Sequence, residues 1–207
     1  ISHLPVIKIE NIKYDEKNLN EYKGIIFTSS NAIKNFDTKE IDKKIYCYCV
    51  GLATEVTAKL NGFQNIYTAE GNVVNLKEII LQTFNPNTGK LLYVSGEIVS
   101  YNLDKELIFE GYRVNRLINY SVLPIEDLDL KFVDSLKSSM PEIVFIYSQN
   151  SAKNFLNLIK KYQLVDSWMN TNLMCIGEKA SSVLNEIKWK KIFLFNPGEE
   201  EYLLYKI

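Results

Sequence analysis

The sequence contains one histidine, His3, and three cysteines among 207 residues, and these low numbers exclude several kinds of site. A zinc site usually takes four cysteine or histidine ligands, and a nucleophilic triad needs a histidine as its general base. Cys47 and Cys49 lie in an apolar run where alternate side chains of a strand share one face. A zinc site there would need two distant carboxylates, so we expect no metal and two buried strand cysteines. The odd number of cysteines also favours a reducing cytoplasm over a disulfide framework.

Long apolar runs and an excess of charge of either sign are also absent. No run approaches the ~18 apolar residues of a membrane-spanning helix, and Ile1–Glu10 lacks the core of a signal peptide. With 24 basic and 25 acidic residues, the net charge is −1, which removes the electrostatic case for nucleic-acid binding. Neither G-x-G-x-x-G after a strand nor G-x-x-x-x-G-K-[ST] occurs. We therefore expect no membrane, nucleic-acid or nucleotide partner.

What the sequence does contain is an alternation of short apolar runs and amphipathic stretches. Runs rich in Ile, Val, Tyr or Phe predict strands at Val6–Ile9, Gly24–Phe27, Ile45–Val50, Asn65–Tyr67, Lys90–Val94, Arg113–Val122, Glu142–Tyr147, Asn172–Ile176 and Lys191–Phe195. Helical periodicity predicts helices at Asn31–Phe36, Thr54–Asn61, Val73–Phe84, Leu103–Phe109, Ser151–Tyr162 and Lys179–Ile187. Such alternation is typical of parallel α/β sheets.

Part of the chain is repeated. Ile25–Phe36 reads IIFTSSNAIKNF, and Val144–Phe155, 119 residues later, reads VFIYSQNSAKNF. Two more pairs follow in order at an offset of 126 residues: Cys49-Val50-Gly51 with Cys175-Ile176-Gly177, and Ile66-Tyr67 with Ile192-Phe193. A seven-residue insertion, which we expect around Tyr162–Asn172, reconciles the offsets. The repeat predicts two similar α/β domains with a cleft between them.

Small polar residues and glycines form corners between strands and helices in both copies of the repeat. These corners are Thr28-Ser29-Ser30-Asn31, Gly51-Leu52-Ala53-Thr54, Gly71-Asn72, Ser95-Gly96-Glu97, Ser148-Gln149-Asn150-Ser151 and Gly177-Glu178-Lys179. Ser and Asn at such positions can cap a helix, because their oxygens accept hydrogen bonds from first-turn N–H groups. Alternatively, free N–H groups and the helix dipole bind anions there. Six corners of this kind would suit a ligand that carries several carboxylates.

The acidic residues Glu126, Asp127 and Asp129 follow Pro124. We interpret them as part of a solvated linker, because no strand end gathers them into the acidic site of a receiver domain.

Several segments, taken in order, resemble the uroporphyrinogen-III synthase family. They are GIIFTSSNAIKNF at 24–36, VGLATEVTAKLNGF at 50–63, LLYVSGE at 91–97, INYSVLP at 118–124, VFIYSQNSAKNF at 144–155 and CIGEKASSVL at 175–184. The resemblance implies two similar parallel-sheet α/β domains, joined by a two-stranded linker, with the active site in the cleft between them. It also implies a cofactor-independent hydro-lyase of haem biosynthesis that closes hydroxymethylbilane to uroporphyrinogen III, inverting ring D and releasing water.

The resemblance and the repeat together give the expected domain limits. One continuous α/β domain should span 7–119, and a discontinuous domain should combine 1–6 with 121–207. Family members open with a strand and a helix before a segment like Leu4–Ile9. That opening is absent from this sequence, so either the discontinuous domain lacks its first strand and helix or the given sequence omits them. We expect a cytoplasmic monomer whose partner is the linear tetrapyrrole.

The resemblance also assigns roles to single residues. Tyr120 aligns with a linker tyrosine implicated in catalysis, although an aromatic residue there could simply pack against the domain edge. Thr54 matches a hydroxyl site of the family or caps a helix, and Lys179 pairs with a substrate carboxylate or stays unengaged at the surface. The family often has a hydroxyl residue where this chain has Ala180. The expected substrate-binding residues are Thr28, Ser29, Ser30, Asn31, Thr54, Gly71, Asn72, Ser95, Gly96, Ser148, Gln149 and Lys179.

Two other functions fit the same sequence. A non-enzymatic two-lobed protein that binds a polycarboxylate would share the fold and the corners, but it would tolerate loss of the Tyr120 hydroxyl. A protein-interaction module would need an exposed apolar patch.

Overall fold

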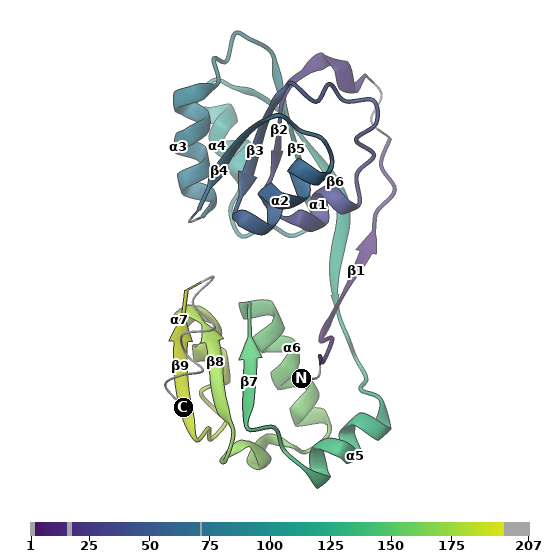
Figure 1. Cartoon of the computed structure of the whole chain (residues 1–207), viewed down its shortest axis with the longest axis vertical. Helices are drawn as coiled ribbons and strands as arrows, with labels where there is room; N and C mark the ends of the chain where they lie inside the picture. The colour runs from purple at the N-terminus through teal and green to yellow at the C-terminus, as the bar shows by residue number, and fades with distance from the viewer. Residues whose placement is uncertain (1–2, 16–17, 71, 197–207) are drawn as a thin grey trace. The chain divides into compact units, whose positions relative to one another are not determined.

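The computed structural model describes residues 3–15, 18–70 and 72–196 of the chain (Figure 1). The chain forms two compact units, of which one is contiguous, Ile9–Val122, and the other combines Ile1–Lys8 with Leu123–Ile207. Each unit contains parallel strands that alternate with helices, so the predicted α/β class is confirmed. No helix in the described part of the chain is long and apolar enough to cross a membrane.

The contiguous unit is built on a six-stranded sheet with the order β1-β6-β5-β2-β3-β4. Its strands are β1 (Ile7–Asn11), β2 (Tyr22–Phe27), β3 (Tyr46–Val50), β4 (Asn65–Ala69), β5 (Lys90–Gly96) and β6 (Arg113–Pro124). Its helices are α1 (Ser30–Lys34), α2 (Leu52–Leu60), α3 (Val73–Thr83) and α4 (Leu103–Phe109), with a 3-10 turn at Leu19–Glu21. The pairs β2–β3, β3–β4, β2–β5 and β5–β6 are all parallel, so their carboxyl ends meet at one edge.

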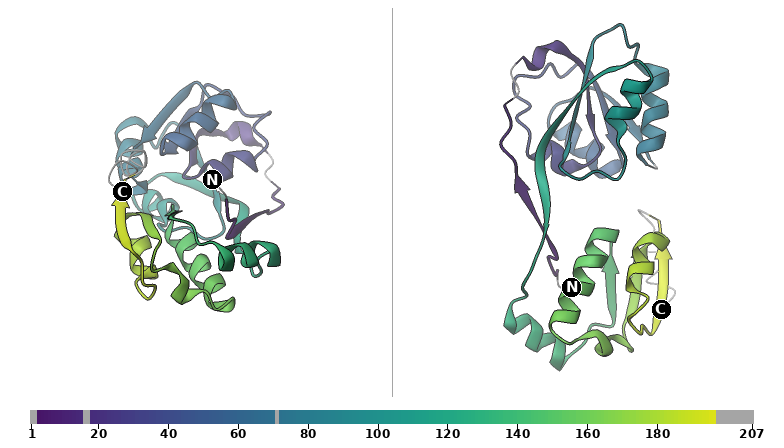
Figure 2. Two further views of the ribbon diagram at one scale, coloured as in Figure 1. Left: turned by 60° about the horizontal axis from the view of Figure 1, so that its bottom comes forward. Right: turned by 180° about the vertical axis from the view of Figure 1, so that it is seen from behind.

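Helices cover both faces of this sheet (Figure 2). Ala32 and Ile33 of α1 and Ala58 of α2 pack on one face, while α3 and α4 pack on the other through Leu76 and Leu103. Because both faces are buried, the central strands are apolar along their whole length rather than alternating. Cys47 and Cys49 lie in the core beneath α1 and α2 as free thiols, as the sequence predicts.

A β-bulge interrupts the pairing of β5 with β6 just before Tyr120. Ser95 pairs with Ile118, but the next residue, Gly96, pairs with Tyr120, so Asn119 is the extra residue. Side chains of a strand alternate between faces, and Tyr120 would otherwise lie on the face of Val114, under α3 and α4. The bulge instead brings Tyr120 into the core beneath α1 and α2.

β1 and β6 are paired antiparallel strands, and each of them contains one of the two boundaries between the units. The N–H of Ile12 donates to the carbonyl of Asn119 (2.9 Å), and the N–H of Ile125 donates to the carbonyl of Val6 (3.0 Å). The chain therefore passes from one unit to the other twice, within two neighbouring strands.

The discontinuous unit has a sheet of the order β7-β8-β9 in its described residues. Its elements are α5 (Leu130–Ser138), β7 (Ile143–Ile146), α6 (Gln149–Lys161), β8 (Asn172–Ile176), α7 (Gly177–Ser181) and β9 (Lys191–Phe195), with 3-10 turns at Val165–Trp168 and Ser182–Leu184. The rings of Phe155, Trp168 and Trp189 pack together, and Val6 from the N-terminal segment joins the same core.

The sequence repeat is also a repeat of strand register. Gly24 pairs with Tyr46 in one unit, and Ile143 pairs with Asn172 in the other, at the offsets of 119 and 126 residues. β3–β4 and β8–β9 correspond in the same way. The two copies lie in separate sheets.

The predicted position of the insertion is wrong. The helix after the first strand has 5 residues in α1 and 13 in α6, so the added residues extend this helix rather than the loop at Tyr162–Asn172. The longer helix buries more apolar surface, through residues such as Leu156 and Ile159.

Two helix predictions also need correction. The helix expected at Lys179–Ile187 is α7, Gly177–Ser181, followed by a 3-10 turn. α5 was not predicted, although its apolar residues recur at helical spacing; only Val133 and Leu136 of them are buried. Asp129 is exposed as expected, but its carboxylate also accepts a 2.9 Å hydrogen bond from the N–H of Lys131 and caps α5.

Candidate functional site

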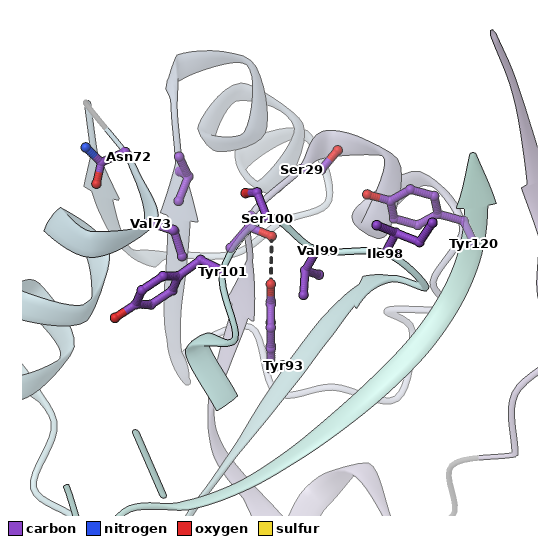
Figure 3. A pocket seen from close by; sticks show the side chains of 12 residues that line it. Ser29, Asn72, Val73, Tyr93, Ile98, Val99, Ser100, Tyr101 and Tyr120 are labelled. Carbon is purple, nitrogen blue, oxygen red and sulfur yellow. Dashed lines mark hydrogen bonds between the residues drawn. The ribbon is translucent and has the colours of Figure 1, made fainter. Parts of the chain in front are cut away.

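The contiguous unit has a pocket of about 370 Å³ at the carboxyl ends of its parallel strands. It is lined by Thr28, Ser29, Val50, Asn72, Val73, Tyr93, Gly96, Ile98, Val99, Ser100, Tyr101 and Tyr120. Figure 3 shows Tyr120 at one end of the pocket and Asn72 at the other. No charged side chain occurs among these described lining residues, so the pocket offers hydroxyl, amide and apolar surface. Ligands of open parallel α/β sheets bind at this edge.

Tyr120 reaches the pocket because of the bulge in β6. Its side chain is 8% exposed and packs with Leu117 in the core beneath α1 and α2. Asn119, the extra residue of the bulge, is fully buried, and its amide donates to the carbonyl of Ala32 in α1 (2.7 Å). The bulge is therefore tied to the helix that follows Thr28 and Ser29, and Tyr120 is held against the same edge of the sheet.

Tyr93 and Thr28 form a hydroxyl pair in the pocket. Their oxygens lie 3.1 Å apart, and either group can donate (Figure 3). Burial raises the pKa of Tyr93, while the hydrogen bond to Thr28 and the charge of Arg116 act in the opposite direction. The phenol therefore keeps its proton at neutral pH and can take part in hydrogen bonding.

Gly96 lies against the ring of Tyr120. A Cβ atom at Gly96 would come within 2.8 Å of Cζ and 3.1 Å of the hydroxyl oxygen of Tyr120. This approach is closer than van der Waals contact allows, so the ring position requires glycine here. Ser95, one residue earlier, is 1% exposed and does not line the pocket; its hydroxyl accepts from Nε of Arg116 and donates to the carbonyl of Gly96.

Three of the polar corner residues serve as helix caps, so the capping alternative is confirmed for them. The hydroxyl of Ser29 accepts from the N–H of Asn31 (3.2 Å), and the hydroxyl of Ser148 accepts from the N–H of Ser151 (3.0 Å). Asn72 forms a capping box at the start of α3 and accepts from the N–H groups of Val74 and Asn75.

Other predicted residues lie outside this pocket. Ser30 and Asn31 are the first two residues of α1 and are partly exposed but do not line it. Thr54 is 4% exposed in the first turn of α2 and faces the interior. α2 has no side-chain cap, because Gly51 (φ 77°) occupies the cap position.

The remaining predicted residues belong elsewhere in the chain. Ser148 and Gln149 begin α6, and Lys179 is exposed on α7, so these three lie in the discontinuous unit. Gly71 lies outside the described residues. In the part of the chain that is described, no group of three or more His, Cys, Asp or Glu side chains could hold a metal ion.

Sequence reasoning missed Tyr93, the segment Ile98–Tyr101 and Arg116. Tyr93 lies inside a predicted strand, and its position shortly before the strand end was a usable signal, because such residues face the carboxyl edge. Ile98–Tyr101 follows β5 without a motif, and Arg116 contacts the site only through the turn that precedes this segment.

A parallel α/β protein with a neutral pocket at the carboxyl ends of its strands belongs to the class that binds small molecules at this edge. The family model described as uroporphyrinogen-III synthase HemD matches residues 1–194. The chain therefore belongs to the uroporphyrinogen-III synthase family.

Individual relatives agree with this assignment. The chain is 27% identical over 106 residues to the chloroplastic uroporphyrinogen-III synthase of Oryza sativa subsp. japonica. The matched residues cover 51% of this chain and 33% of the rice protein. The chain thus matches about a third of that relative's length.

Solved structures share the fold. Uroporphyrinogen-III synthetase from Helicobacter pylori superposes with a TM-score of 0.69 at 20% identity, over 99% of this chain and 92% of that one. A mutant uroporphyrinogen III synthase from the extremely thermophilic bacterium Thermus thermophilus superposes with a TM-score of 0.54 at 15% identity, over 98% of this chain and 86% of that one.

Proposed function

We propose that this protein closes hydroxymethylbilane to uroporphyrinogen III, with inversion of ring D and loss of water, in haem biosynthesis. The family match over residues 1–194 supports this function. The observation that carries it is the Tyr120 side chain, which lines the pocket at the carboxyl edge of the sheet. No hydrogen bond to the Tyr120 hydroxyl occurs within the described residues, so the group is available to a ligand.

In the proposed reaction the substrate supplies the driving electrons. The pyrrole nitrogen next to the hydroxymethyl group pushes its electron pair toward the carbon, and the C–O bond breaks. Tyr120 donates a hydrogen bond and then a proton to the departing oxygen, which leaves as water. Inversion of ring D requires that two C–C bonds form and one breaks. The freed methylene carbon first bonds the α-carbon of ring D that already carries the bridge from ring C, and that bridge bond then breaks, with the pyrrole nitrogen of ring C supplying the electrons. The bridge carbon then bonds the other α-carbon of ring D, which loses a proton, and this proton restores the phenol. The reaction requires no cofactor.

Carboxylate binding is assigned to the residues of the corners, whose donors are neutral apart from the ammonium group of Lys179. The proposed residues are Thr28, Ser29, Ser30, Asn31, Thr54, Gly71, Asn72, Ser95, Gly96, Ser148, Gln149 and Lys179. The first N–H groups of α2 are the strongest candidates, because the cap position holds Gly51 and offers them no side-chain acceptor. At Ser29, Asn72 and Ser148 the caps already occupy N–H groups, so a ligand there would bind the side chain or compete with it.

We also propose that the substrate lies in a cleft between two domains, 7–119 and 1–6 with 121–207, joined by a two-stranded linker. A pocket of about 370 Å³ is near the lower end of the range for small-molecule sites. It would hold part of a linear tetrapyrrole, so the rest of the substrate needs further surface. The antiparallel pairing of β1 with β6 supports the linker.

A monomer in the cytoplasm completes the proposal. The three cysteines are buried free thiols, as is common in proteins of reducing compartments.

To test the proposed function, purified protein is added to hydroxymethylbilane, and the type I and type III isomers of the product are separated and quantified. Spontaneous closure gives the type I isomer, so type III product formed at a rate proportional to protein concentration supports the enzyme. Type I product alone, at the rate of a heat-denatured control, rejects it. In that case saturable binding of the substrate would favour the two-lobed binding protein.

A further inference from the structure

We propose that Arg116 is a positioning residue for Tyr120 and acts through the peptide that joins Gly96 to Glu97. The inference rests on the proposed function, because it concerns the group that donates to the leaving hydroxyl. Arg116 itself is outside the pocket lining, so we assign it no direct contact with a ligand in the pocket.

The Arg116 side chain binds three consecutive residues of the turn at the end of β5. Its Nε donates to the hydroxyl of Ser95 (2.8 Å), and its Nη2 donates to the carbonyls of Gly96 (2.8 Å) and Glu97 (2.9 Å). A planar guanidinium can engage these acceptors together, whereas the ammonium of a lysine is a single point. The guanidinium therefore fixes the course of the turn.

The same turn is fixed from its other side by Tyr120. The N–H of Glu97 donates to the Tyr120 carbonyl (2.9 Å), while the carbonyl of Gly96, in the same peptide, accepts from Arg116. Because a peptide is planar, a hydrogen bond at each end sets its position and its tilt. This one peptide thus links the Arg116 guanidinium to the Tyr120 backbone.

The turn also supports the Tyr120 ring directly. Gly96 is so close to the ring that a methyl group there would lie 2.8 Å from Cζ. If the peptide moves after loss of Arg116, both the backbone bond and the surface under the ring move with it.

A double-mutant cycle tests this role. We expect Arg116→Ala to lower kcat about 10-fold, less than Tyr120→Phe does, with KM changed by less than about threefold. In the Tyr120→Phe background the same change should lower kcat by less than about twofold, because the group that Arg116 positions is already gone. Equal fold-losses in both backgrounds would overturn the proposal and leave Arg116 with a structural role.

Arg113 provides a matched control, since it is the other arginine of the chain and is exposed on the same strand. Arg113→Ala should leave kcat and KM unchanged. Adding methylguanidinium should restore kcat in Arg116→Ala but not in Arg113→Ala or Tyr120→Phe, and Arg116→Lys should recover only part of the loss. Absence of rescue in an Arg116→Ala protein that folds and binds methylguanidinium would count against the proposal.

A readout independent of turnover separates this inference from the proposed function. With 3-fluorotyrosine incorporated at the 13 tyrosines, the ¹⁹F resonance of Tyr120 is the one lost in Tyr120→Phe. It should shift or broaden in Arg116→Ala and stay in place in Arg113→Ala. If Arg116→Ala does not fold, Arg116→Gln and Arg116→Lys serve instead. An unmoved resonance rejects the positioning role, whereas a moved resonance in a protein that makes only type I product rejects the proposed function alone.

Discussion

The hydroxyl groups of Thr28 and Tyr93 share one hydrogen bond of 3.1 Å in the pocket. The two groups together have two protons, and their mutual bond uses one of them. Whichever group donates, the other keeps a proton that it can direct at a ligand. The pair therefore offers one donor to the pocket, and its direction can adapt to the ligand.

Tyr93→Phe tests this arrangement. The change keeps the ring in the core but removes the partner of Thr28, so we expect kcat/KM to fall about threefold to tenfold. We also expect the free energy of unfolding to fall by about 0.5–1.5 kcal/mol, as for one neutral hydrogen bond. Chemical denaturation and the isomer assay measure the two effects. A buried tyrosine of the same sheet, Tyr48, which hydrogen-bonds Thr83 away from the pocket, is the control, because Tyr48→Phe should affect stability alone.

Tyr120→Phe should lower turnover by about 10²-fold or less. The ring and its packing remain, but the proton donor for the leaving hydroxyl is lost, and proton transfer of this kind contributes ~10²–10⁴-fold. The pyrrole nitrogen still expels the hydroxyl, which keeps the loss near the lower limit. The product should remain the type III isomer. Unchanged turnover would return Tyr120 to a packing role, and a switch to type I would mean that it shapes the folding of the substrate.

Gly96→Ala should disturb Tyr120 without touching its hydroxyl. The new methyl group would lie 2.8–2.9 Å from Cζ and Cε2, so the ring has to turn away. We expect turnover to fall at least as far as in Tyr120→Phe. Combined with Tyr120→Ala, which makes room for the methyl group, Gly96→Ala should add little further loss. Steady-state kinetics of the unchanged protein, the two single variants and the double variant measure this. If Gly96→Ala lowers turnover as much in the Tyr120→Ala background as in the unchanged protein, the turn itself is damaged.

Ser29→Ala and Ser148→Ala should change the free energy of unfolding more clearly than the rate of turnover. Each hydroxyl caps a helix, so its loss should lower the free energy of unfolding by about 0.5–2 kcal/mol. Turnover should fall no more than about threefold to tenfold, the effect of one neutral hydrogen bond. Ser→Asn at each position keeps a capping oxygen and should restore stability. Complete inactivation of a folded variant would instead make the side chain a participant in the reaction.

Stability should decrease at alkaline pH because of the buried thiols. Burial raises the pKa of Cys175 to about 11, and the hydrogen bond with Cys49 followed by burial raises that of Cys47. An unfolded thiol has a pKa of about 8.5, so above that value the unfolded state binds fewer protons than the folded state. The thiols' contribution to the free energy of unfolding is therefore complete below about pH 8.5 and falls as pH rises toward 11.

Urea unfolding of the protein and of Cys175→Ala at pH 7.5 and pH 10 isolates the Cys175 effect. Between pH 7.5 and pH 10 the free energy of unfolding should decrease less in Cys175→Ala than in the unchanged protein. A thiol reagent at pH 8 should react with the three cysteines only after unfolding, and rapid labelling of the folded protein would contradict the burial of these residues.

The strands were predictable because they are short, apolar and bounded by turn residues. Ile45–Val50 and Asn172–Ile176 were located to within a residue, since burial on both faces leaves no polar interruption. The repeat added long-range information, because equal offsets in sequence reappear as equal strand registers. Helix lengths were harder to predict, since the extent of α6 depends on how much surface Trp168 and its neighbours cover.

Only part of the candidate site was predicted from the sequence, and the reason is physical. Polar residues that follow strands, such as Ser29 and Asn72, are visible in the sequence. The position of Tyr120 depends on the bulge at Asn119, and strict alternation would assign Tyr120 to the opposite face of the sheet. Arg116 was invisible for a similar reason, because its acceptors belong to a turn 20 residues earlier in the chain.

The double passage of the chain between its units has a consequence for synthesis on the ribosome. Every strand of the sheet that contains β2–β6 is available once β6 has emerged, so this unit can fold while translation continues. Val6 is made before β2–β6, yet its core partners, such as Leu128 and Val133, come only after β6. The apolar segment around Val6 therefore waits for burial until α5 has been made, and a chain that stalls between β6 and α5 exposes it beside an already folded sheet. We expect chaperones and proteases to act on this segment in nascent chains, and synonymous codons that slow translation there should lower the yield of folded protein.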